Sequence, residues 1–425
     1  QRAEKGNFIS AAGLLQQAIE SDKNYVDAYL ALASVYAKLK NHTSSIAGYE
    51  KAFAIDSNYT LDYKALYAAQ LAGQGAFEKA LYAVNDLLTR KPPKNTTALN
   101  RIQQQKKNYE FAIDQEKNNT QKNYVFAPQN LGNTVNSVES EYFPTLSIDG
   151  KKLVFTRRIN NTNEDFYYSE LKDGKWEPAK EIEGGINTDH NEAAQNISAD
   201  GEWMVFTATG RLEGYGNYDL YQSYKTDSVN WSAPKNLGGR LNSDQWDAQP
   251  CLSPDKRNLY FASRRLGGYG GIDIYVCYLQ PNGRWSAPEN LGPGINTAGD
   301  DQCPFIHADN QTLYFVSNGW PGYGGDDLFY ARKEPGDKWS KPVNLGYPIN
   351  TTSDEGTLFI AADGKTAYYA SDRSDTKGAY DIYSFELRED IRPYKTLWVK
   401  GQVFDKKTTR GLASSVELID MASKE

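Results

Sequence analysis

The sequence predicts a multidomain α + β protein with three parts: a helical array, a five-bladed β-propeller and the start of a β-sandwich. Apolar residues at helical spacing run through residues 1–118, a repeated block fills 124–390, and an alternating strand pattern follows in 396–425. The repeat is the strongest of these observations, because Asn296 and Asn350 stand 54 residues apart in matching surroundings. Repeats of this length indicate a propeller or a solenoid, since one unit cannot bury its own faces.

Each block of the repeat has the pattern of four short strands. Runs rich in Val, Ile, Tyr and Phe, such as 259–262 and 272–275, alternate with turns of Gly, Pro, Asn and Asp, as expected for strands joined by turns. The last block, around Asp363, lacks the closing segment and its Trp, whereas residues 127–132 match the closing segments of the other blocks. We therefore expect strand 124–132 to complete the last blade and close a ring of five, which removes the open sheet edges.

Residues 1–118 have a different periodicity. Apolar side chains recur at helical spacing, with breaks at Asn41, at 56–58 and at the 73–75 turn, which predicts helices joined by short loops. The spacing of about 34 residues between copies resembles the tetratricopeptide repeat. Under this interpretation, the polar helix predicted for 97–116 caps the array.

Residues 396–425 alternate as a strand and continue with further short apolar patterns. The patterns V-x-G-x-V-x-D, T-x-x-G-L and V-x-L-x-D follow one another, and this order resembles the opening of a carboxypeptidase-regulatory-like β-sandwich. The resemblance implies that the chain contains the N-terminal part of that domain.

Composition limits the class of function. Lys plus Arg number 47 against 54 Asp plus Glu, for a net charge of −7, so we expect no nucleic-acid partner. No stretch approaches the ~20 apolar residues of a membrane span, so we expect no transmembrane segment in this chain. We also expect no cofactor. A signal peptide is not visible, but both ends of the sequence look trimmed.

Three cysteines cannot form a disulfide framework. Cys251 and Cys303 fall near the start of the innermost strands of neighbouring blocks, and Cys277 falls in a third strand. A Cys251–Cys303 bridge and burial as small apolar residues both remain open, and the offset between the two positions favours burial. The three His stand apart in the sequence, and no His or Cys spacing predicts a metal site.

One carboxylate recurs near the start of the innermost strand of every block. In a propeller these strands begin beside the central channel, so we expect an acidic ring around one mouth of the channel. Loops that contain Gly-Tyr-Gly emerge on the same face, because successive strands alternate in direction. The candidate partner-binding face consists of Glu141, Glu192, Asp247, Asp301, Glu355, Tyr215, Tyr269 and Tyr323.

Two interpretations of this face remain open. Each carboxylate accepts hydrogen bonds from the adjoining loop and holds one blade to the next, or the ring binds a cation or a basic segment of a partner. We favour the first interpretation. The Gly-Tyr-Gly loops are either turns in which Gly supplies a positive φ or contact sites for a partner.

Most of the conspicuous residues repeat in several blocks, which argues against catalysis, because a catalytic residue needs to occur only once. The Asp before the third strand of each block predicts architecture, and the Trp that closes four blocks predicts packing between blades. These residues are Asp165, Asp219, Asp273, Asp327 and Asp381, and Trp176, Trp231, Trp285 and Trp339. We therefore expect no catalytic residue and no enzyme, with a propeller glycosidase that uses two carboxylates kept as an alternative.

The motifs of the block resemble a known family. The patterns S-x-D-G-x-x-L-Y-F-x-S, G-G-Y-G-G-x-D-I-Y and W-x-x-P-x-N-L-G-x-x-I-N are similar to the propeller repeats of TolB-like and related periplasmic proteins of Bacteroidetes. Lys256 and Arg257 depart from the pattern at one turn, and the first block lacks the Gly-Tyr-Gly loop. The order of the three parts resembles that of the multidomain OmpA-family proteins of this phylum, which include the PorE type of the type IX secretion system.

This resemblance implies a non-enzymatic scaffold in the periplasm, associated with the outer membrane. It implies β-barrel partners of the PorP/SprF type, other secretion components, and attachment to peptidoglycan through a C-terminal OmpA-like domain that these 425 residues do not contain. Two alternatives remain: a propeller that binds or cleaves glycans, and a TolB-like sensor through whose channel a peptide threads.

Overall fold

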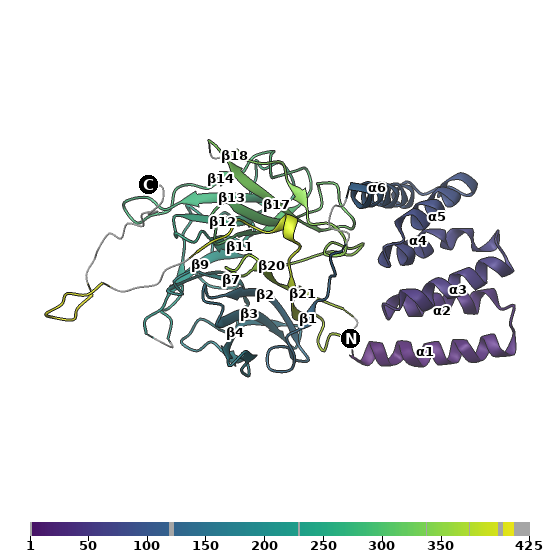
Figure 1. Ribbon diagram of the computed structural model, residues 1–425, viewed down its shortest axis with the longest axis horizontal. Helices are drawn as coiled ribbons and strands as arrows, with labels where there is room; N and C mark the ends of the chain where they lie inside the picture. Colours follow the sequence, from purple (N-terminus) through teal and green to yellow (C-terminus); the bar gives the residue numbers. More distant parts are fainter. Residues whose placement is uncertain are drawn as a thin grey trace.

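The computed structural model of the chain describes residues 2–118, 123–227, 230–336, 338–373, 375–397 and 403–411. Its two main parts are a stack of helices and a β-propeller, which lie beside each other (Figure 1). A shared apolar cluster and hydrogen bonds join the two parts.

Residues 2–118 form six α-helices and one short 3-10 helix. They are α1 (Arg2–Ser21), α2 (Val26–Lys38), α3 (His42–Ile55), η1 (Tyr59–Tyr63), α4 (Lys64–Gly73), α5 (Phe77–Arg90) and α6 (Thr96–Asn118). Each α-helix packs against the next one in sequence, so the six form a single stack (Figure 1). The helix predicted for 97–116 is α6, and the tetratricopeptide interpretation of the stack stays a prediction.

Small residues and a helix cap explain the local structure of the stack. A side chain on Gly48 of α3 would meet the Cβ of Ala33 of α2 at 3.0 Å, so these two helices approach closely. Helix α3 starts at His42 because the side chain of Asn41 accepts a hydrogen bond of 3.1 Å from the backbone N–H of Ser44. This bond satisfies one of the free N–H groups at the helix start.

The repeated blocks form five sheets, which confirms the five-bladed propeller. Blade 1 contains β2 (Ser140–Leu146), β3 (Lys152–Ile159), β4 (Asn163–Lys172), β5 (Lys175–Trp176) and β6 (Lys180–Glu181). Blade 2 contains β7 (Glu192–Ile197), β8 (Trp203–Ala208), β9 (Asp219–Tyr224) and β10 (Lys235–Asn236). Blade 3 contains β11 (Asp247–Leu252), β12 (Asn258–Ser263), β13 (Asp273–Tyr278) and β14 (Glu289–Asn290). Blade 4 contains β15 (Asp301–Ile306), β16 (Thr312–Ser317), β17 (Asp327–Glu334), β18 (Lys338–Trp339) and β19 (Val343–Asn344), and blade 5 contains β20 (Leu358–Ile360), β21 (Thr366–Ser371) and β22 (Asp381–Glu386).

The N-terminal side of the propeller supplies the outermost strand of blade 5. Strand β1 (Gln129–Asn130) pairs antiparallel with β22. The side chain of Asn130 donates to Asp381 at 2.7 Å, and the side chain of Asn136 bonds both the N–H and the C=O of Ile382, at 2.8 and 2.9 Å. The ring is therefore closed by hydrogen bonds between its first and last segments, which protects the sheet edge that blade 5 would otherwise expose.

The innermost strands of blades 1 to 4 contain a bulge at the centre of the ring. The bulged residues Phe143, Ala194, Gln249 and Cys303 have positive φ values of 51° to 55°, which are uncommon for residues other than Gly. Hydrogen bonds from the neighbouring blade hold this conformation: the N–H of Gln249 donates to Oγ1 of Thr207 at 3.0 Å, and the N–H of Cys303 donates to Oε1 of Gln249 at 2.8 Å. The centre of the ring is thus linked blade to blade.

The closing Trp of the blocks pack as predicted. Trp231 belongs to an apolar cluster with Phe166 of blade 1 and Phe206 of blade 2, and Trp285 packs with residues of blades 2 and 3 such as Leu220. Their apolar surface therefore joins neighbouring blades, where burial contributes most to stability.

The cysteines are buried and unbridged. All three are free, Cys251 and Cys277 are buried, and Cys303 is half-buried. Burial raises the pKa of each thiol to about 12. The alternative of a Cys251–Cys303 bridge is therefore wrong.

The chain continues past β22 along blade 4. The short 3-10 helix η2 (Glu389–Ile391) accepts a hydrogen bond at the C=O of Ile391 from the hydroxyl of Tyr314, at 2.8 Å. Most of the predicted β-sandwich, 396–425, lies outside the described residues. Within the described part of this segment, Phe404 and Gly411 form one isolated antiparallel bridge.

Candidate docking face

The Asp before each third strand holds the Gly-Tyr-Gly loops in place. In blade 3, the carboxylate of Asp273 accepts hydrogen bonds from the N–H groups of Tyr269 and Gly270, at 2.6 and 3.1 Å. Asp219 binds the loop of blade 2 at the same two positions, with distances of 2.6 and 3.1 Å, and Asp327 binds the loop of blade 4 at 2.9 and 3.2 Å. These Asp are therefore architectural, as predicted, and they fix the backbone on either side of each Tyr.

The same loops fasten each blade to the next. The second Gly of the blade 3 loop lies so close to blade 4 that a Cβ on Gly270 would stand 1.9 Å from the C=O of Gly299. The N–H of Gly271 donates to that carbonyl at 3.0 Å, and the N–H of Asp301 donates to the C=O of Ile272 at 2.8 Å. Only Gly fits this close approach of two backbones, so the loops are rigid turns.

The five carboxylates of the candidate face are held inside the propeller. Glu141, Glu192, Asp247 and Asp301 are 0% exposed, and Glu355 is half-buried. Each accepts a hydrogen bond from a Ser or Thr four residues earlier, with distances of 2.5 to 2.9 Å from the hydroxyl groups. These donors are Ser137, Thr188, Ser243, Thr297 and Thr351. The expectation of an acidic ring around the channel mouth is therefore wrong for the four buried carboxylates, and the hydrogen bonds support the favoured interpretation that they hold the loops.

In the first three blades, an arginine forms an ion pair with the carboxylate of the candidate face. Arg157, Arg211 and Arg265 form ion pairs of 2.7, 2.8 and 2.6 Å with Glu141, Glu192 and Asp247. Without such partners, burial of charge would cost several kcal/mol.

Blade 4 differs at the position of the arginine. Gly319 takes this position, and the indole N–H of the next residue, Trp320, donates to the C=O of Ile295 at 2.9 Å. In blade 3, the guanidinium of Arg265 reaches the equivalent carbonyl, that of Leu241, at 2.7 Å. Burial raises the pKa of Asp301 above its ordinary value. The repeat is therefore broken in the blade that meets the helices.

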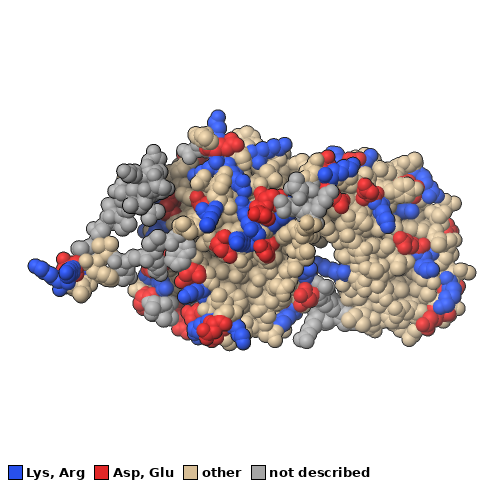
Figure 2. Space-filling view, viewed as in Figure 1, with Lys and Arg blue, Asp and Glu red and all other residues tan. Residues whose placement is uncertain are grey.

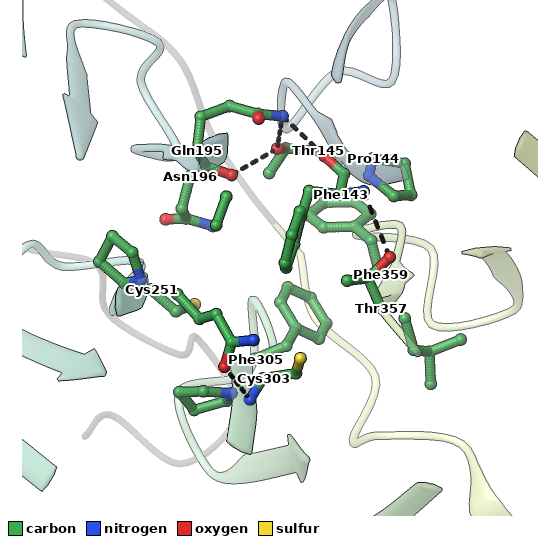
Figure 3. A pocket seen from close by; sticks show the side chains of 15 residues that line it. Phe143, Pro144, Thr145, Gln195, Asn196, Cys251, Cys303, Phe305, Thr357 and Phe359 are labelled. Carbon is green, nitrogen blue, oxygen red and sulfur yellow. Dashed lines mark hydrogen bonds between the residues drawn. The ribbon is translucent and has the colours of Figure 1, made fainter. Parts of the chain in front are cut away.

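The central channel is narrow and contains no carboxylate among its lining residues. Its cavity of about 50 Å³ is lined by the bulged segments of blades 1 to 4 and by residues 357–359 of blade 5. Figure 3 shows the labelled side chains of these segments facing one another across the cavity, with the rings of Phe305 and Phe359 in contact at a centroid distance of 4.8 Å. The amide of Gln195 spans blades 1 and 2, because its Nε2 donates to the C=O of Phe143 at 2.6 Å. Aromatic rings and amides thus fill the middle of the ring.

The third tyrosine of the face lies in the interface with the helices. Tyr323 is 4% exposed and packs between Phe77 of α5 and Phe111 of α6, with ring centroids at 5.7 and 5.5 Å. Tyr347 of the same blade meets Phe77 edge to face at 5.3 Å. Burial raises the pKa of both tyrosines. The loop of blade 4 is therefore a docking element whose occupant is the helical stack of the same chain.

Polar contacts complete this interface. The side chain of Asn108 on α6 donates to the C=O of Gly324 at 2.9 Å, and Lys40 forms an ion pair of 2.5 Å with Asp372 of blade 5. The ion pair is partly exposed and contributes at most about 1 kcal/mol. The aromatic cluster and the Asn108 bond are therefore the main fixed contacts between the two parts.

The sequence contained an unused signal for this interface. Asn-Leu-Gly is followed by Gly239 in blade 2, Pro293 in blade 3 and Tyr347 in blade 4. Trp320 also departs from the Arg-Leu pattern of the preceding loops. Extra aromatic residues in a single copy of a repeat indicate a contact that the other copies do not make.

The two remaining tyrosines of the face are free of the helices. Tyr215 is 55% exposed and Tyr269 is 52% exposed, and each loop carries a Leu that is almost fully exposed, Leu212 and Leu266. The structure thus divides the candidate face into a buried acidic part, one covered tyrosine and two exposed loops.

The described residues offer neither a metal centre nor a membrane span. Within them, no group of three His, Cys, Asp or Glu is placed to hold a metal ion, and no helix is long and apolar enough to cross a membrane. On the face shown in Figure 2, acidic and basic side chains are interspersed over both parts of the molecule.

Comparisons with known proteins identify no family for this chain. No family model matches the chain, and no curated protein matches it. TolB from Acinetobacter baumannii is similar in structure, with a TM-score of 0.39 and 18% identity over 59% of this chain. The chain spans a little over half of that TolB, since the match covers 56% of it.

Glycoside hydrolases are similar at the same level. A GH62 hydrolase in complex with xylotriose has a TM-score of 0.42 with 11% identity, over 62% of this chain and 97% of its own. An α-L-arabinofuranosidase from Lactobacillus brevis has a TM-score of 0.40 with 11% identity, over 66% of this chain and 95% of its own. These likenesses concern the propeller architecture, and no activity follows from them. Its own sheets and helices make the chain a five-bladed propeller protein with an attached helical stack.

Proposed function

We propose that this chain is a non-enzymatic docking scaffold of the periplasm, associated with the outer membrane, like the multidomain OmpA-family proteins that its order of parts resembles. Its partners are outer-membrane β-barrel proteins of the PorP/SprF type and other components of a secretion complex. Attachment to peptidoglycan belongs to an OmpA-like domain that lies outside these residues.

The apolar interface between the helical stack and the propeller is the main observation behind this proposal. Tyr323, Tyr347, Phe77 and Phe111 form one aromatic cluster across the join, and Asn108 adds a hydrogen bond. A join of this kind holds two binding surfaces at a set distance, which suits a scaffold that positions other proteins. Relative motion of neighbouring domains is expected unless their interface is large and hydrophobic, and aromatic rings form the core of this one.

The channel supports docking over the two alternatives. Sites that bind small ligands usually measure about 300–1,000 Å³, whereas this cavity measures about 50 Å³. A glycosidase needs two carboxyl groups that face the substrate, and no lining residue of the channel is an Asp or a Glu. The contact between Phe305 and Phe359 also leaves little room for a threaded peptide.

A pull-down tests the proposal. The full chain is immobilised and incubated with detergent-solubilised outer membranes of the cells that make it, and bound proteins are quantified by mass spectrometry. We expect an integral β-barrel protein to be enriched over bare resin, and to be recovered less well when Tyr323→Ala loosens the join. Enrichment no greater than on bare resin would defeat the proposal. Binding or hydrolysis in a parallel glycan panel would favour the glycan alternative instead.

A further inference from the structure

The exposed loops of blades 2 and 3 are copies of the loop that already docks helices in blade 4. In all three loops an Asp accepts hydrogen bonds from the N–H of the Tyr and of the following Gly, with distances between 2.6 and 3.2 Å. The backbone around Tyr215 and Tyr269 is therefore held as it is around Tyr323. Blades 2, 3 and 4 follow one another around the ring, so the three loops lie in one arc that continues the existing interface.

The loops differ in whether helices cover their tyrosine. Tyr323 is 4% exposed because helices α5 and α6 enclose it, whereas Tyr215 and Tyr269 are 55% and 52% exposed. Leu212 and Leu266 protrude beside them, 104% and 91% exposed. Two loops of neighbouring blades thus present two Leu and two Tyr to solvent, and Tyr is a residue that is enriched in interfaces.

These loops are preorganised for binding. The Asp bonds fix each loop from one side, and the next blade fixes it from the other, since a Cβ on Gly216 or Gly270 would stand 2.0 or 1.9 Å from a backbone oxygen. A partner that binds rigid loops loses little conformational entropy, which leaves more of the contact energy as affinity.

The occupant of blade 4 shows what such a loop receives. Phe77 at the first position of α5 and Phe111 of α6 enclose the tyrosine ring, and Asn108 donates to the carbonyl of the following Gly at 2.9 Å. A matching partner for blades 2 and 3 is therefore a pair of amphipathic helices with Phe or another large apolar side chain on each helix, and an Asn or Gln about one turn from this side chain on one of them.

We propose that the Gly-Tyr-Gly loops of blades 2 and 3, with Leu212, Tyr215, Leu266 and Tyr269, form a second docking site that receives an amphipathic helix pair of a partner protein. This inference rests on the proposed docking function and adds the place of the contact and the shape of the partner. The helical stack of the chain and this partner would then lie next to each other on one face of the propeller.

Photo-crosslinking tests the site directly. p-Benzoylphenylalanine is placed at Tyr269 in the full chain, which is irradiated with the same membrane extract, and the crosslinked peptide is sequenced. A matched control carries the probe at Tyr25, which is 47% exposed and lies between α1 and α2, on the side of the stack away from α5 and α6. We expect an adduct at position 269 with a helical, amphipathic segment of one partner, and no adduct with that segment at position 25.

A second variant separates this inference from the proposed function. Leu212→Ser with Leu266→Ser keeps the loop backbone, and far-UV circular dichroism and Trp fluorescence should match those of the wild type. Recovery of the partner should fall about tenfold or more, as expected when two central contacts are truncated. If the wild type captures an outer-membrane protein that the double variant captures equally well, the inference fails while the docking function stands. If neither captures one, both fail.

The identity of the adduct decides among the other occupants. An adduct with a second copy of this chain would replace the partner by self-association and overturn the proposal. An adduct with a strand or loop segment of a β-barrel would overturn the helix pair. The absence of an adduct at position 269, and also at position 215 in a second variant with the probe at Tyr215, would overturn the site.

Discussion

Removal of the Tyr323 side chain should uncouple the helical stack from the propeller. Tyr323 is 4% exposed and touches Phe77, Phe111 and Tyr347 at 5.7, 5.5 and 6.3 Å between ring centroids. Truncation of a buried aromatic side chain to Ala costs about 3–5 kcal/mol. Because 1 kcal/mol shifts the midpoint of a domain of this size by roughly 4 °C, the stack in Tyr323→Ala should melt at least roughly 10 °C lower.

Two optical signals follow the two parts separately. None of the eight Trp lies within residues 1–118 and seven lie within 124–390, so Trp fluorescence reports mainly the propeller, while circular dichroism at the helical minimum reports mainly the stack. In the wild type, we expect both signals to change together on heating. In Tyr323→Ala, the helical signal should change first and the Trp signal close to its original temperature.

The repeat provides a matched control for this experiment. Tyr269→Ala makes the same chemical change in the equivalent loop, where the ring is 52% exposed, and should shift neither midpoint by more than a few degrees. An unchanged helical midpoint in Tyr323→Ala, or an equal fall in Tyr269→Ala, would refute the reasoning, because the aromatic cluster would then not couple the two parts.

Three further predictions concern the propeller. Gly270→Ala should lower the free energy of unfolding by about 1–3 kcal/mol, through the clash of its Cβ with the neighbouring blade, whereas Gly294→Ala, with open space around it, should be neutral in urea titrations. Arg265→Ala should cost about 3–5 kcal/mol because it leaves a buried carboxylate without its cation, whereas the exposed Arg264→Ala should change urea stability little. Burial raises the pKa of Asp327 to about 7, so the folded state binds more protons than the unfolded state between about pH 4 and that value. Stability should therefore fall as pH rises through this window, and Asp327→Asn should flatten the slope of unfolding free energy against pH.

Each of these predictions can fail on its own. Equal urea midpoints for Gly270→Ala and the wild type would mean that the loop does not fasten blades 3 and 4. Equal losses in the two arginine variants would remove the special role of the buried ion pair. A pH slope that persists in Asp327→Asn would assign the pH dependence to other groups.

The internal repeat was sufficient to predict the propeller. The separation of 54 residues between Asn296 and Asn350, together with the match between 127–132 and the block ends, indicated five blades and a closing strand. The repeated Asp and Trp were predicted to be architectural, and the structure places them in loop caps and between blades. These features follow from periodicity, because every copy of a repeat forms the same strands and turns with the same local contacts.

The burial of the carboxylates of the candidate face could be recognised only in the tertiary structure. Whether a carboxylate faces solvent depends on the donors that the fold brings to it, here a Ser or Thr four residues earlier and, in three blades, an Arg from the end of the next strand. The Ser and Thr were visible in the sequence, at Ser137, Thr188, Ser243, Thr297 and Thr351. Their role as hydrogen-bond donors to the carboxylates could be assigned only from the structure, because the same spacing also fits a solvent-exposed turn.

By itself, the sequence determined the number of blades, the closure of the ring and the existence of a separate helical part, since all three follow from local periodicity along the chain. Only the tertiary structure decided that Tyr323 is covered while Tyr215 and Tyr269 are exposed. The repeat makes these tyrosines equivalent, and the contact that distinguishes them joins residues more than 200 positions apart, such as Asn108 and Gly324. Such contacts depend on how whole parts pack together. The extra aromatic residues Trp320 and Tyr347 mark the blade that makes a contact, but they do not identify the helices that it contacts.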